Sequence, residues 1–433
     1  MRGRSLAVAI EALSWMAYAR LGERTALFRA GNQLDARPDE LRHAHRLIME
    51  TTRFQNRLDY YVSASAARLE KVPHGVSVFL RILAFSKHVD RMDQKQLQVM
   101  ISSARQILGW KTLRPFEEVM GRIISQTCQI GVDDEYERTA LETCHPAWYV
   151  KHVMLIFGRD VGLQILNRDL TPVPLYIRSN PLRTVSSSAQ DEVGIKVEGV
   201  EGVWKLSDRP KLGREHLDLV KSGKIAIQDF SSIVSGIVAS PRRGDTVIDA
   251  CAAPGNKTAH LAALMHNEGE IISVDVSRDR MLRWRKETNR MGCLIAHGVV
   301  ADVAKLDLKC EADVAIVDPP CSNTGVFAKN PAMKWKLSPS RLQNLVEVQT
   351  AILNSVSKQV RVGGTLTYST CSILPEENEG LIDSFLKRNP EYRLEPQCPF
   401  FGSVGVKGLK NAQRFYPHLH ECNGYFIAKL RRG

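Results

Sequence analysis

The sequence predicts an α/β protein with an all-helical first part, a small α+β connector and a doubly wound domain built on a largely parallel sheet. Apolar residues recur every 3.6 residues from residue 4 to about 160. After residue 231, short β-rich runs alternate with helical ones. Such alternation is typical of a parallel sheet, which binds its ligands at the carboxyl ends of its strands.

The first part, residues 1–160, is expected to fold as a helical bundle. Its N-terminal run from Ser5 to Ile10 imitates a signal peptide, but Glu11 interrupts that run. Apolar residues instead recur at helical spacing here, at Leu6, Ile10, Leu13 and Ala17. We therefore expect the chain to begin with a helix of the bundle.

The connector, residues 170–235, shows short β-rich runs such as Val173–Arg178 and Ile195–Val200. The last part, residues 236–433, is the doubly wound domain. Four of its strands are expected at Thr246–Ala250, Ile271–Val276, Val314–Val317 and Thr365–Ser369.

Composition limits the functional classes. The chain has 433 residues and a net charge of +12, which favours a polyanionic partner, although an ordinary basic protein fits the charge equally well. Nine cysteines without any C-x-x-C pair indicate neither a disulfide framework nor a metal site. No uncharged apolar run approaches the ~20 residues that span a bilayer. We expect a cytoplasmic protein in a reducing compartment, without a membrane partner.

The segment Val247–Leu261 reads as a strand, a tight turn and a helix. It lacks the G-x-G-x-x-G fingerprint, and Cys251 and Asn256 stand where a P-loop needs glycine. Asp275 ends the next strand, where it can accept ribose hydroxyls, and Asp302 can reach the adenine. Either aspartate alone is more often a helix cap. Their recurrence after successive strands predicts an adenosine ligand without a phosphate grip, which points to S-adenosylmethionine.

Two cysteines, Cys321 and Cys371, each follow an apolar, strand-like run. A thiolate is the strongest nucleophile among the common side chains. Aromatic pyrimidine carbons must be attacked covalently before they can accept a methyl group. The two thiols therefore suggest covalent catalysis.

These residues belong to a set of motifs that resembles the Sun/NSUN/RsmB family of RNA cytosine-5 methyltransferases. The resemblance runs from about Arg178 to Leu430. Its motifs are Asp249-Ala-Cys-Ala-Ala-Pro-Gly255, Asp318-Pro-Pro-Cys-Ser-Asn-Thr-Gly325, Lys329-Asn-Pro331 with Lys334-Trp335, Tyr368-Ser-Thr-Cys-Ser372 with Glu376-Glu-Asn-Glu379, and Arg414-Phe-Tyr-Pro-His418, with Arg178-Ser-Asn180 and Gln228-Asp-Phe-Ser-Ser232 in the connector. The resemblance implies a Rossmann-like methyltransferase domain.

The resemblance also implies the roles of individual residues. Cys371 is the attacking thiol, Asp318 contacts ring nitrogen 3 of the base, and Cys321 assists release of the product. Lys257 is the candidate cation near the thiols. The implied cofactor-binding residues are Asp249, Cys251, Ala252, Ala253, Pro254, Gly255, Asn256, Lys257, Asp275, Arg280, Asp302 and Asp318. Lys329, Lys334 and Trp335 could grip phosphate or stack on a base, although Trp335 alone would more often be a core residue.

The helical first part is similar, more weakly, to the NusB-like RNA-binding domain that precedes the catalytic part in bacterial RsmB. The segment from His43 to Leu58 carries most of that similarity. Its arginines, Arg46, Arg53 and Arg57, could contact RNA, but a solvated helix face is the simpler interpretation.

The NusB-like similarity favours ribosomal RNA as the substrate, with 5-methylcytidine as the product. A tRNA methyltransferase, a DNA cytosine methyltransferase and a catalytically silent ribosome-assembly factor remain alternatives, and no obligate protein partner is inferred. Asn256 and Asn323 occupy positions where the family commonly has glycine. If either position requires positive φ, asparagine is the next best tolerated residue, so we expect altered detail with retained function.

Overall fold

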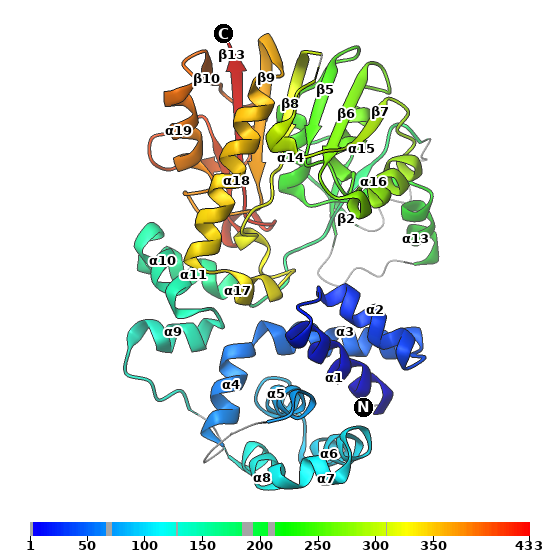
Figure 1. Ribbon diagram of the computed structural model, residues 1–433, viewed down its shortest axis with the longest axis vertical. Helices are drawn as coiled ribbons and strands as arrows, with labels where there is room; N and C mark the ends of the chain where they lie inside the picture. Colours follow the sequence, from blue (N-terminus) through cyan, green and yellow to red (C-terminus); the bar gives the residue numbers. More distant parts are fainter. Residues whose placement is uncertain (1–2, 66–71, 127–128, 184–193, 207–212, 309) are drawn as a thin grey trace. The chain divides into compact units, whose positions relative to one another are not determined.

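A computed structural model describes residues 3–65, 72–126, 129–183, 194–206, 213–308 and 310–433 (Figure 1). The chain forms two compact units. The helical unit contains Met1–Leu170 together with Asn330–Lys336, and the α/β unit contains Thr171–Lys329 and Leu337–Gly433. Among the described residues, no helix is both long enough and apolar enough to cross a membrane.

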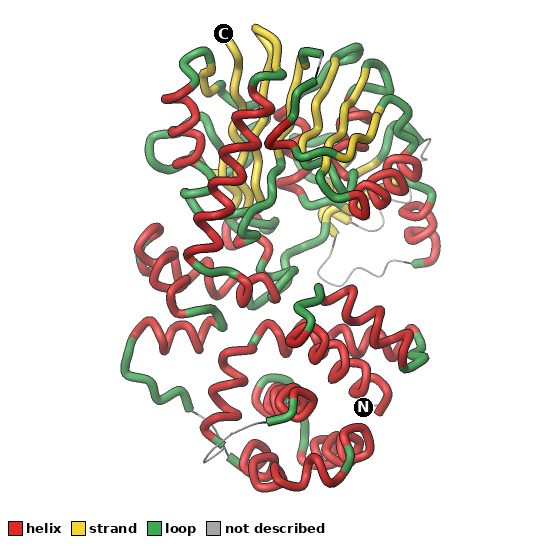
Figure 2. Tube along the Cα trace, in the orientation of Figure 1, coloured by secondary structure: helices red, strands yellow, loops and turns green. Residues whose placement is uncertain are grey.

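The described part of the helical unit contains helices and connecting loops (Figure 2). Its elements are α1 (Gly3–Tyr18), α2 (Glu23–Gln33), α3 (Pro38–Arg53), α4 (Gln55–Ala64), α5 (His74–His88), α6 (Gln94–Leu108), α7 (Trp110–Leu113), η1 (Arg114–Phe116), α8 (Glu117–Ser125), α9 (Glu135–Thr143), α10 (Ala147–Phe157), α11 (Arg159–Arg168) and α17 (Ala332–Lys336). Helix α5 packs against α1, α3, α4, α6 and α8. It is buried on nearly all sides, as its apolar sequence requires.

The α/β unit is built on a sheet that has nine strands within the described residues, in the order β11-β12-β13-β9-β8-β5-β6-β7, with β10 paired to β13. Strands β7, β6, β5, β8 and β9 are parallel, and the strands beyond β9 are antiparallel. The strands are β5 (Thr246–Ala250), β6 (Glu270–Asp275), β7 (Ala296–Val300), β8 (Ala312–Val317), β9 (Val360–Thr370), β10 (Tyr392–Leu394), β11 (Ser403–Val404), β12 (Gln413–Phe415) and β13 (Tyr425–Arg432). The predicted doubly wound α/β class is confirmed.

Helices cover both faces of this sheet, because successive residues of a buried strand point to opposite sides. Along β5, Val247 packs in the cluster that includes α15, and Ile248 packs in the cluster that includes α18 and α19. The helices of the unit are α13 (Arg214–Lys221), α14 (Phe230–Ala239), α15 (Asn256–Leu264), α16 (Arg278–Met291), η2 (Val303–Lys305), η3 (Thr324–Val326), α18 (Pro339–Ser357), α19 (Glu379–Arg388) and α20 (Pro417–His420).

The connector forms a small antiparallel sheet in the order β2-β3-β1-β4. Its strands are β1 (Tyr176–Ser179), β2 (Gly194–Lys196), β3 (Val203–Leu206) and β4 (Ile225–Ile227). Tyr176 and Val203 pack in the same apolar cluster as Phe230 of α14. This cluster fixes the small sheet against the large one within the α/β unit.

Candidate active site

The loop after β5 brings the backbone close to where a ligand binds in a doubly wound sheet. Cys251 and Gly255 adopt positive φ, 64° and 111°. A Cβ atom at Gly255 would lie 3.2 Å from Trp284, so this turn requires glycine. The backbone N–H of Ala252 donates to the carbonyl of Val274 (3.0 Å), which ties the loop to β6. The loop ends at Asn256, the first residue of α15.

Asp249, at the end of β5, is buried under this loop. Thr258 donates to its Oδ2 (2.5 Å), whereas Oδ1 has no hydrogen-bond partner among the described residues. Burial raises the pKa of this carboxyl to about 7. A buried oxygen without a donor fits a ligand that brings amino or hydroxyl groups, as the amino acid and ribose parts of S-adenosylmethionine do.

Asp275, at the end of β6, is also buried. Its Oδ2 accepts from the backbone of Ala253 (3.3 Å), and its Oδ1 accepts from the backbone of Ser277 (3.0 Å). Arg280 forms an ion pair with it (3.0 Å) and also donates to the carbonyl of Ala253. Asp275 therefore links the loop after β5 to the start of α16, next to the position predicted for the ribose.

Asp302 follows β7 and caps the short helix η2, where its Oδ1 accepts from the backbone of Ala304 (3.1 Å). Its side chain is exposed. This is the capping role that is common for an aspartate in such a position.

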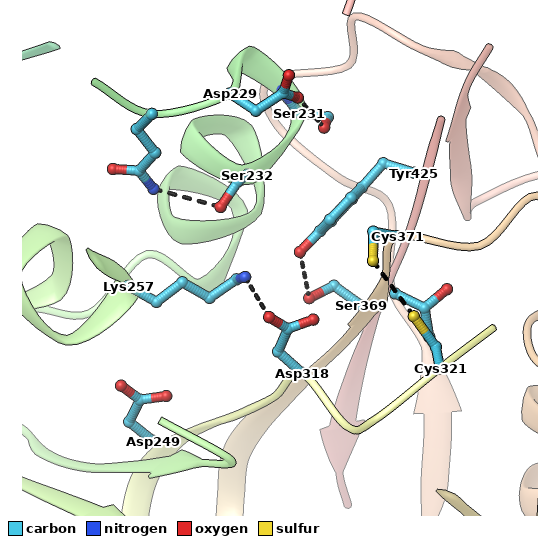
Figure 3. Close-up of polar contacts among 12 residues, drawn as sticks. Asp229, Ser231, Ser232, Asp249, Lys257, Asp318, Cys321, Ser369, Cys371 and Tyr425 are labelled. Atoms are coloured by element: carbon cyan, nitrogen blue, oxygen red, sulfur yellow. Dashed lines mark hydrogen bonds and ion pairs between the residues drawn. The ribbon is translucent and has the colours of Figure 1, made fainter. Parts of the chain in front are cut away.

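Lys257 and Asp318 form an ion pair in which Nζ lies 2.5 Å from Oδ2 (Figure 3). Burial disfavours the charged form of Lys257, but the attraction of Asp318 and Tyr425 outweighs it and raises the pKa of this lysine. Lys257 also lies over the Tyr425 ring, 5.6 Å from its centroid. We expected this cation beside the thiols, and the structure instead directs it to the carboxylate that follows β8.

The two cysteines predicted for catalysis lie side by side, with their sulfur atoms 3.3 Å apart (Figure 3). Cys371 follows β9, and Cys321 lies in the loop after β8, which is parallel to β9. The thiol of Cys321 is buried, whereas that of Cys371 is partly exposed. The hydrogen bond with Cys371, together with burial, raises the pKa of Cys321 well above its ordinary value. Cys321 is therefore a neutral thiol beside a more accessible one.

Asn323 contacts both cysteines. Its Oδ1 accepts from the Cys371 thiol (3.2 Å), and its Nδ2 donates to the carbonyl of Cys321 (2.8 Å). Its φ is 61°, a conformation that asparagine tolerates better than most residues do. Positive φ is thus required at Asn323, whereas Asn256 begins a helix and has no such requirement.

A buried carboxylate, Glu377, fixes the loop that carries Cys321. The backbone and the hydroxyl of Ser322 donate to its two carboxylate oxygens (2.8 and 2.5 Å). Gln349 donates both to Glu377 and to the carbonyl of Pro320 (2.8 and 2.9 Å). The loop is therefore held on both sides of Cys321 by groups that do not themselves contact the thiols.

The loop that carries Cys371 is fixed in a similar way. Asn378 binds Thr370 and the carbonyl of Ser372, on either side of Cys371. The backbone N–H of Gly325 donates to the carbonyl of Cys371 (2.9 Å). The run Glu376–Glu379 thus supports both cysteine loops. The sequence offered only one signal for this role, which was an acidic run following an apolar strand.

Several basic and aromatic residues have internal partners that sequence reasoning did not foresee. Lys329 pairs with Asp229 (3.1 Å), which caps α14. Lys334 is fully buried in the helical unit and donates to the carbonyl of Cys144 (3.2 Å), and the Trp335 indole donates to the carbonyl of Thr52 (2.7 Å). The predicted role of Lys334 in gripping phosphate is therefore wrong, whereas stacking of the partly exposed Trp335 ring on a base stays a prediction.

The prediction of a solvated arginine face on α3 and α4 is also wrong in part. Arg53 is buried and donates to the carbonyl of Asp169 (3.1 Å). Arg57 donates to the carbonyls of Leu141 and Glu142 at the end of α9. Only Arg46 keeps a mostly exposed side chain, paired with Asp90.

The described residues contain no group of three or more His, Cys, Asp or Glu side chains that could hold a metal ion. The polar groups that converge at the carboxyl ends of β5, β8 and β9 are Lys257, Asp318, Cys321, Asn323 and Cys371. They combine two thiols with a carboxylate and its cation, and this set suits covalent attack on a polar ring.

Comparison with known proteins gives consistent matches. Residues 236–431 match the model of the 16S rRNA methyltransferase RsmB/F family. A probable ribosomal RNA small subunit methyltransferase B of Bacillus subtilis is 28% identical over 401 residues, which cover 89% of this chain and 89% of that protein. A tRNA (cytosine(72)-C(5))-methyltransferase of Pyrococcus horikoshii is 37% identical over 240 residues, 55% of this chain and 59% of that protein.

Among solved structures, that of PH0851 has a TM-score of 0.85 and 26% identity. The alignment covers 100% of this chain and 99% of that one. The likeness extends over the helical unit as well as the α/β unit.

Proposed function

We propose that this chain, which belongs to the Sun/NSUN/RsmB family of RNA cytosine-5 methyltransferases, forms 5-methylcytidine in ribosomal RNA through a covalent cysteine–cytosine adduct. Its cofactor is S-adenosylmethionine. The observation that carries the covalent mechanism is the 3.3 Å contact between the Cys321 and Cys371 sulfur atoms, next to the loop that starts with Asp318.

In the proposed reaction, the thiolate of Cys371 adds to carbon 6 of cytosine. Asp318, paired with Lys257, contacts ring nitrogen 3, and the pair passes a proton to that nitrogen, which neutralises the negative charge that the addition places on the ring. Carbon 5 thereby becomes nucleophilic. The loop after β5, together with Asp249 and Asp275, would hold S-adenosylmethionine, which would supply the electrophilic methyl group that carbon 5 accepts and leave as S-adenosylhomocysteine.

Product release requires loss of the proton on carbon 5 and breakage of the bond between sulfur and carbon 6. We assign assistance in this step to Cys321, because its sulfur lies beside that of Cys371: its thiol gives its proton to the departing Cys371 sulfur as it takes up the proton from carbon 5. The Cys371 thiol is the more accessible of the two, which supports its assignment as the attacking group.

Ribosomal RNA is favoured because the rRNA-type relative aligns with 89% of this chain, whereas the tRNA-type relative aligns with 55%. We assign RNA binding to the helical unit, in the manner of a NusB-like domain. The target base must leave its stack to meet a thiol approaching perpendicular to the ring. We therefore expect a cytidine in a single-stranded or loop region.

The test is transfer of a tritiated methyl group from S-adenosylmethionine to unmodified 16S rRNA, to tRNA and to DNA, followed by bisulfite mapping of the modified site. We expect incorporation into one cytidine of the rRNA. Incorporation into tRNA alone would replace the substrate assignment, and incorporation into DNA alone would overturn the family function.

The cysteine roles make a separate prediction. Cys371→Ala should abolish transfer, because it removes the thiol that attacks carbon 6, and the remaining Cys321 is a buried neutral thiol. Cys321→Ala should accumulate a protein–RNA adduct that survives a denaturing gel. Full turnover by Cys371→Ala, or an adduct that forms only with Cys371→Ala, would reverse the assignment. The exposed cysteine variant Cys398→Ala is the matched control.

A further inference from the structure

A cavity of about 820 Å³ lies in the α/β unit between the small sheet and α15. Its walls come from β1, β2 and β3 on one side and from α15 and the turn that follows it on the other, where His260 of the helix and His266 of the turn line it. This volume is ample for a nucleotide-sized group. The catalytic residues described above do not line it.

Arg178, on β1, lines this cavity and is only 4% exposed. Its Nε donates to Gln228 (3.3 Å) and its Nη1 to the carbonyl of Ser179 (3.2 Å). Its Nη2 has no hydrogen-bond partner among the described residues, and none of their carboxylates forms an ion pair with it. Glu287, which attracts it from a distance, is already paired with Arg290 (2.5 Å).

A buried guanidinium without a counterion is unfavourable, because charge removed from water needs a partner. Burial lowers the pKa of Arg178 to about 10, which reflects this cost. A bound anion would remove the cost, and the unpartnered Nη2 provides a donor for it.

The remaining lining agrees with an anionic ligand. Arg183 and Lys196 add positive charge at exposed positions of the cavity, against one exposed acidic residue, Glu201. His260 is buried in the wall, where burial and the neighbouring Arg178 hold its pKa well below the ordinary value. His260 is therefore neutral and adds no charge to the cavity.

We propose that this cavity binds a phosphate group of the substrate RNA backbone, with Arg178 as the buried anchor and with Arg183 and Lys196 at the rim. This inference rests on the proposed function for the identity of the ligand. A guanidinium recognises phosphate through paired hydrogen bonds, and backbone phosphates position a nucleic acid without reading its sequence. The cavity thus holds the RNA outside the catalytic centre.

The test measures binding of a fluorescent single-stranded RNA by anisotropy at a series of KCl concentrations. Arg178→Gln should weaken binding roughly tenfold. The double variant Arg183→Gln with Lys196→Gln should reduce the slope of log affinity against log salt by about 0.7 for each phosphate that the protein no longer neutralises. Arg178→Lys, which keeps the charge, should recover part of the affinity. In the methylation assay, the weaker binding should appear mainly in KM for RNA.

Arg393→Gln is the matched control, since it removes one exposed positive charge on β10 at the other end of the unit. If Arg178→Gln fails to fold, the double variant decides the proposal. Variants that bind RNA as the wild type does, with unchanged salt slopes, would overturn it. Equally weakened binding in Arg393→Gln would overturn it too, because the effect would then reflect net charge alone.

A second arm separates RNA phosphate from free phosphate. The melting temperature of the wild type and of Arg178→Gln is measured in sodium phosphate and in NaCl of equal ionic strength. If phosphate raises the melting temperature of the wild type alone, and Arg178→Gln binds RNA as tightly as the wild type does, the cavity binds free phosphate. The RNA proposal would then be wrong. Because anisotropy needs no methyl transfer, an inactive wild type that still binds RNA through Arg178 would contradict the proposed function and leave this site standing.

Discussion

Arg414 and Arg178 are both buried in the α/β unit, but their surroundings are opposite. Arg414 pairs with the equally buried Glu379 (Nη2 to Oε2, 2.6 Å) and donates to the carbonyl of Ile373 (2.9 Å). Burial opposes its charge, but Glu379 outweighs burial and raises the pKa of Arg414. Arg178 has no such carboxylate, and burial lowers its pKa to about 10.

The difference separates two uses of a buried charge. Arg414 and Glu379 join β12 to the segment that supports the Cys371 loop, so the pair is complete within the protein and positions the catalytic residues. Arg178 has no counterion among the described residues, and it lines a cavity. A buried charge that is paired within the protein indicates a structural role, and a buried charge without a counterion indicates a ligand.

The strongest test of this comparison removes the carboxylate from the complete pair. Glu379→Gln should lower the free energy of unfolding by about 3–5 kcal/mol, because Arg414 would remain buried without a counterion. Urea denaturation of the full chain, followed by circular dichroism, measures this decrease. Arg178→Gln is the matched variant and should cost much less, since it removes a cation that lacks a counterion. Equal destabilisation in the two variants would break the comparison.

Lys334 offers an intermediate case in the helical unit. It is fully buried, with its Nζ bonded to the carbonyl of Cys144 (3.2 Å) and Asp169 as the acid that attracts it. Burial lowers its pKa from 10.5 to about 8. Between these pH values the unfolded chain binds more protons than the folded one, so the free energy of unfolding rises with pH.

Lys334→Met should therefore stabilise the helical unit at pH 7, by at most about 3 kcal/mol. The advantage should shrink above pH 8 and vanish above pH 10.5, where the lysine is neutral in both states. Calorimetric melting of both proteins across this range tests the sign. A gap that widens with pH would contradict the assigned pKa direction.

The sequence predicted best what depends on local pattern. The strand Thr246–Ala250 was placed correctly because an apolar run ended by a turn is a local signal. The two cysteines, each expected after an apolar strand-like run, do follow the neighbouring parallel strands β8 and β9, whereas their separate roles come from the family resemblance. The antiparallel edge from β10 to β13 was missed, since its pairing is set by residues far apart in the chain.

Partners of charged side chains were predicted poorly, for the same reason. Arg53 and Lys334 looked solvent-facing or RNA-facing in the sequence, yet both donate to carbonyls in distant helices. The support that Glu377 gives to Ser322 joins residues that are remote in sequence. Helical or strand periodicity shows which residues are buried, but it does not show which buried polar groups form hydrogen bonds with each other.

The smallest predicted effect concerns Asn323, whose Oδ1 is paired with the Cys371 thiol. Nδ2 is occupied by the carbonyl of Cys321, so the oxygen faces the sulfur and stabilises S–H but not S⁻. Asn323→Gly keeps a residue that tolerates positive φ and removes this acceptor, together with the amide donor to the carbonyl of Cys321, which does not contact the Cys371 thiol. Alkylation of Cys371 by iodoacetamide at pH 7 should then be about two- to fivefold faster, as expected when one hydrogen bond is removed.

Mass spectrometry of the modified peptide measures this rate separately from that of the buried Cys321. Asn256→Gly is the matched control, since it makes the same change at the first residue of α15, whose side chain has no hydrogen bond to either thiol, and it should leave the rate unchanged. A slower or equal rate in Asn323→Gly would mean that the amide does not hold the neutral thiol. In that case the difference between a polar group that has a partner within the protein and one that lacks it would hold for the buried cations alone. It would not extend to the attacking thiol of Cys371.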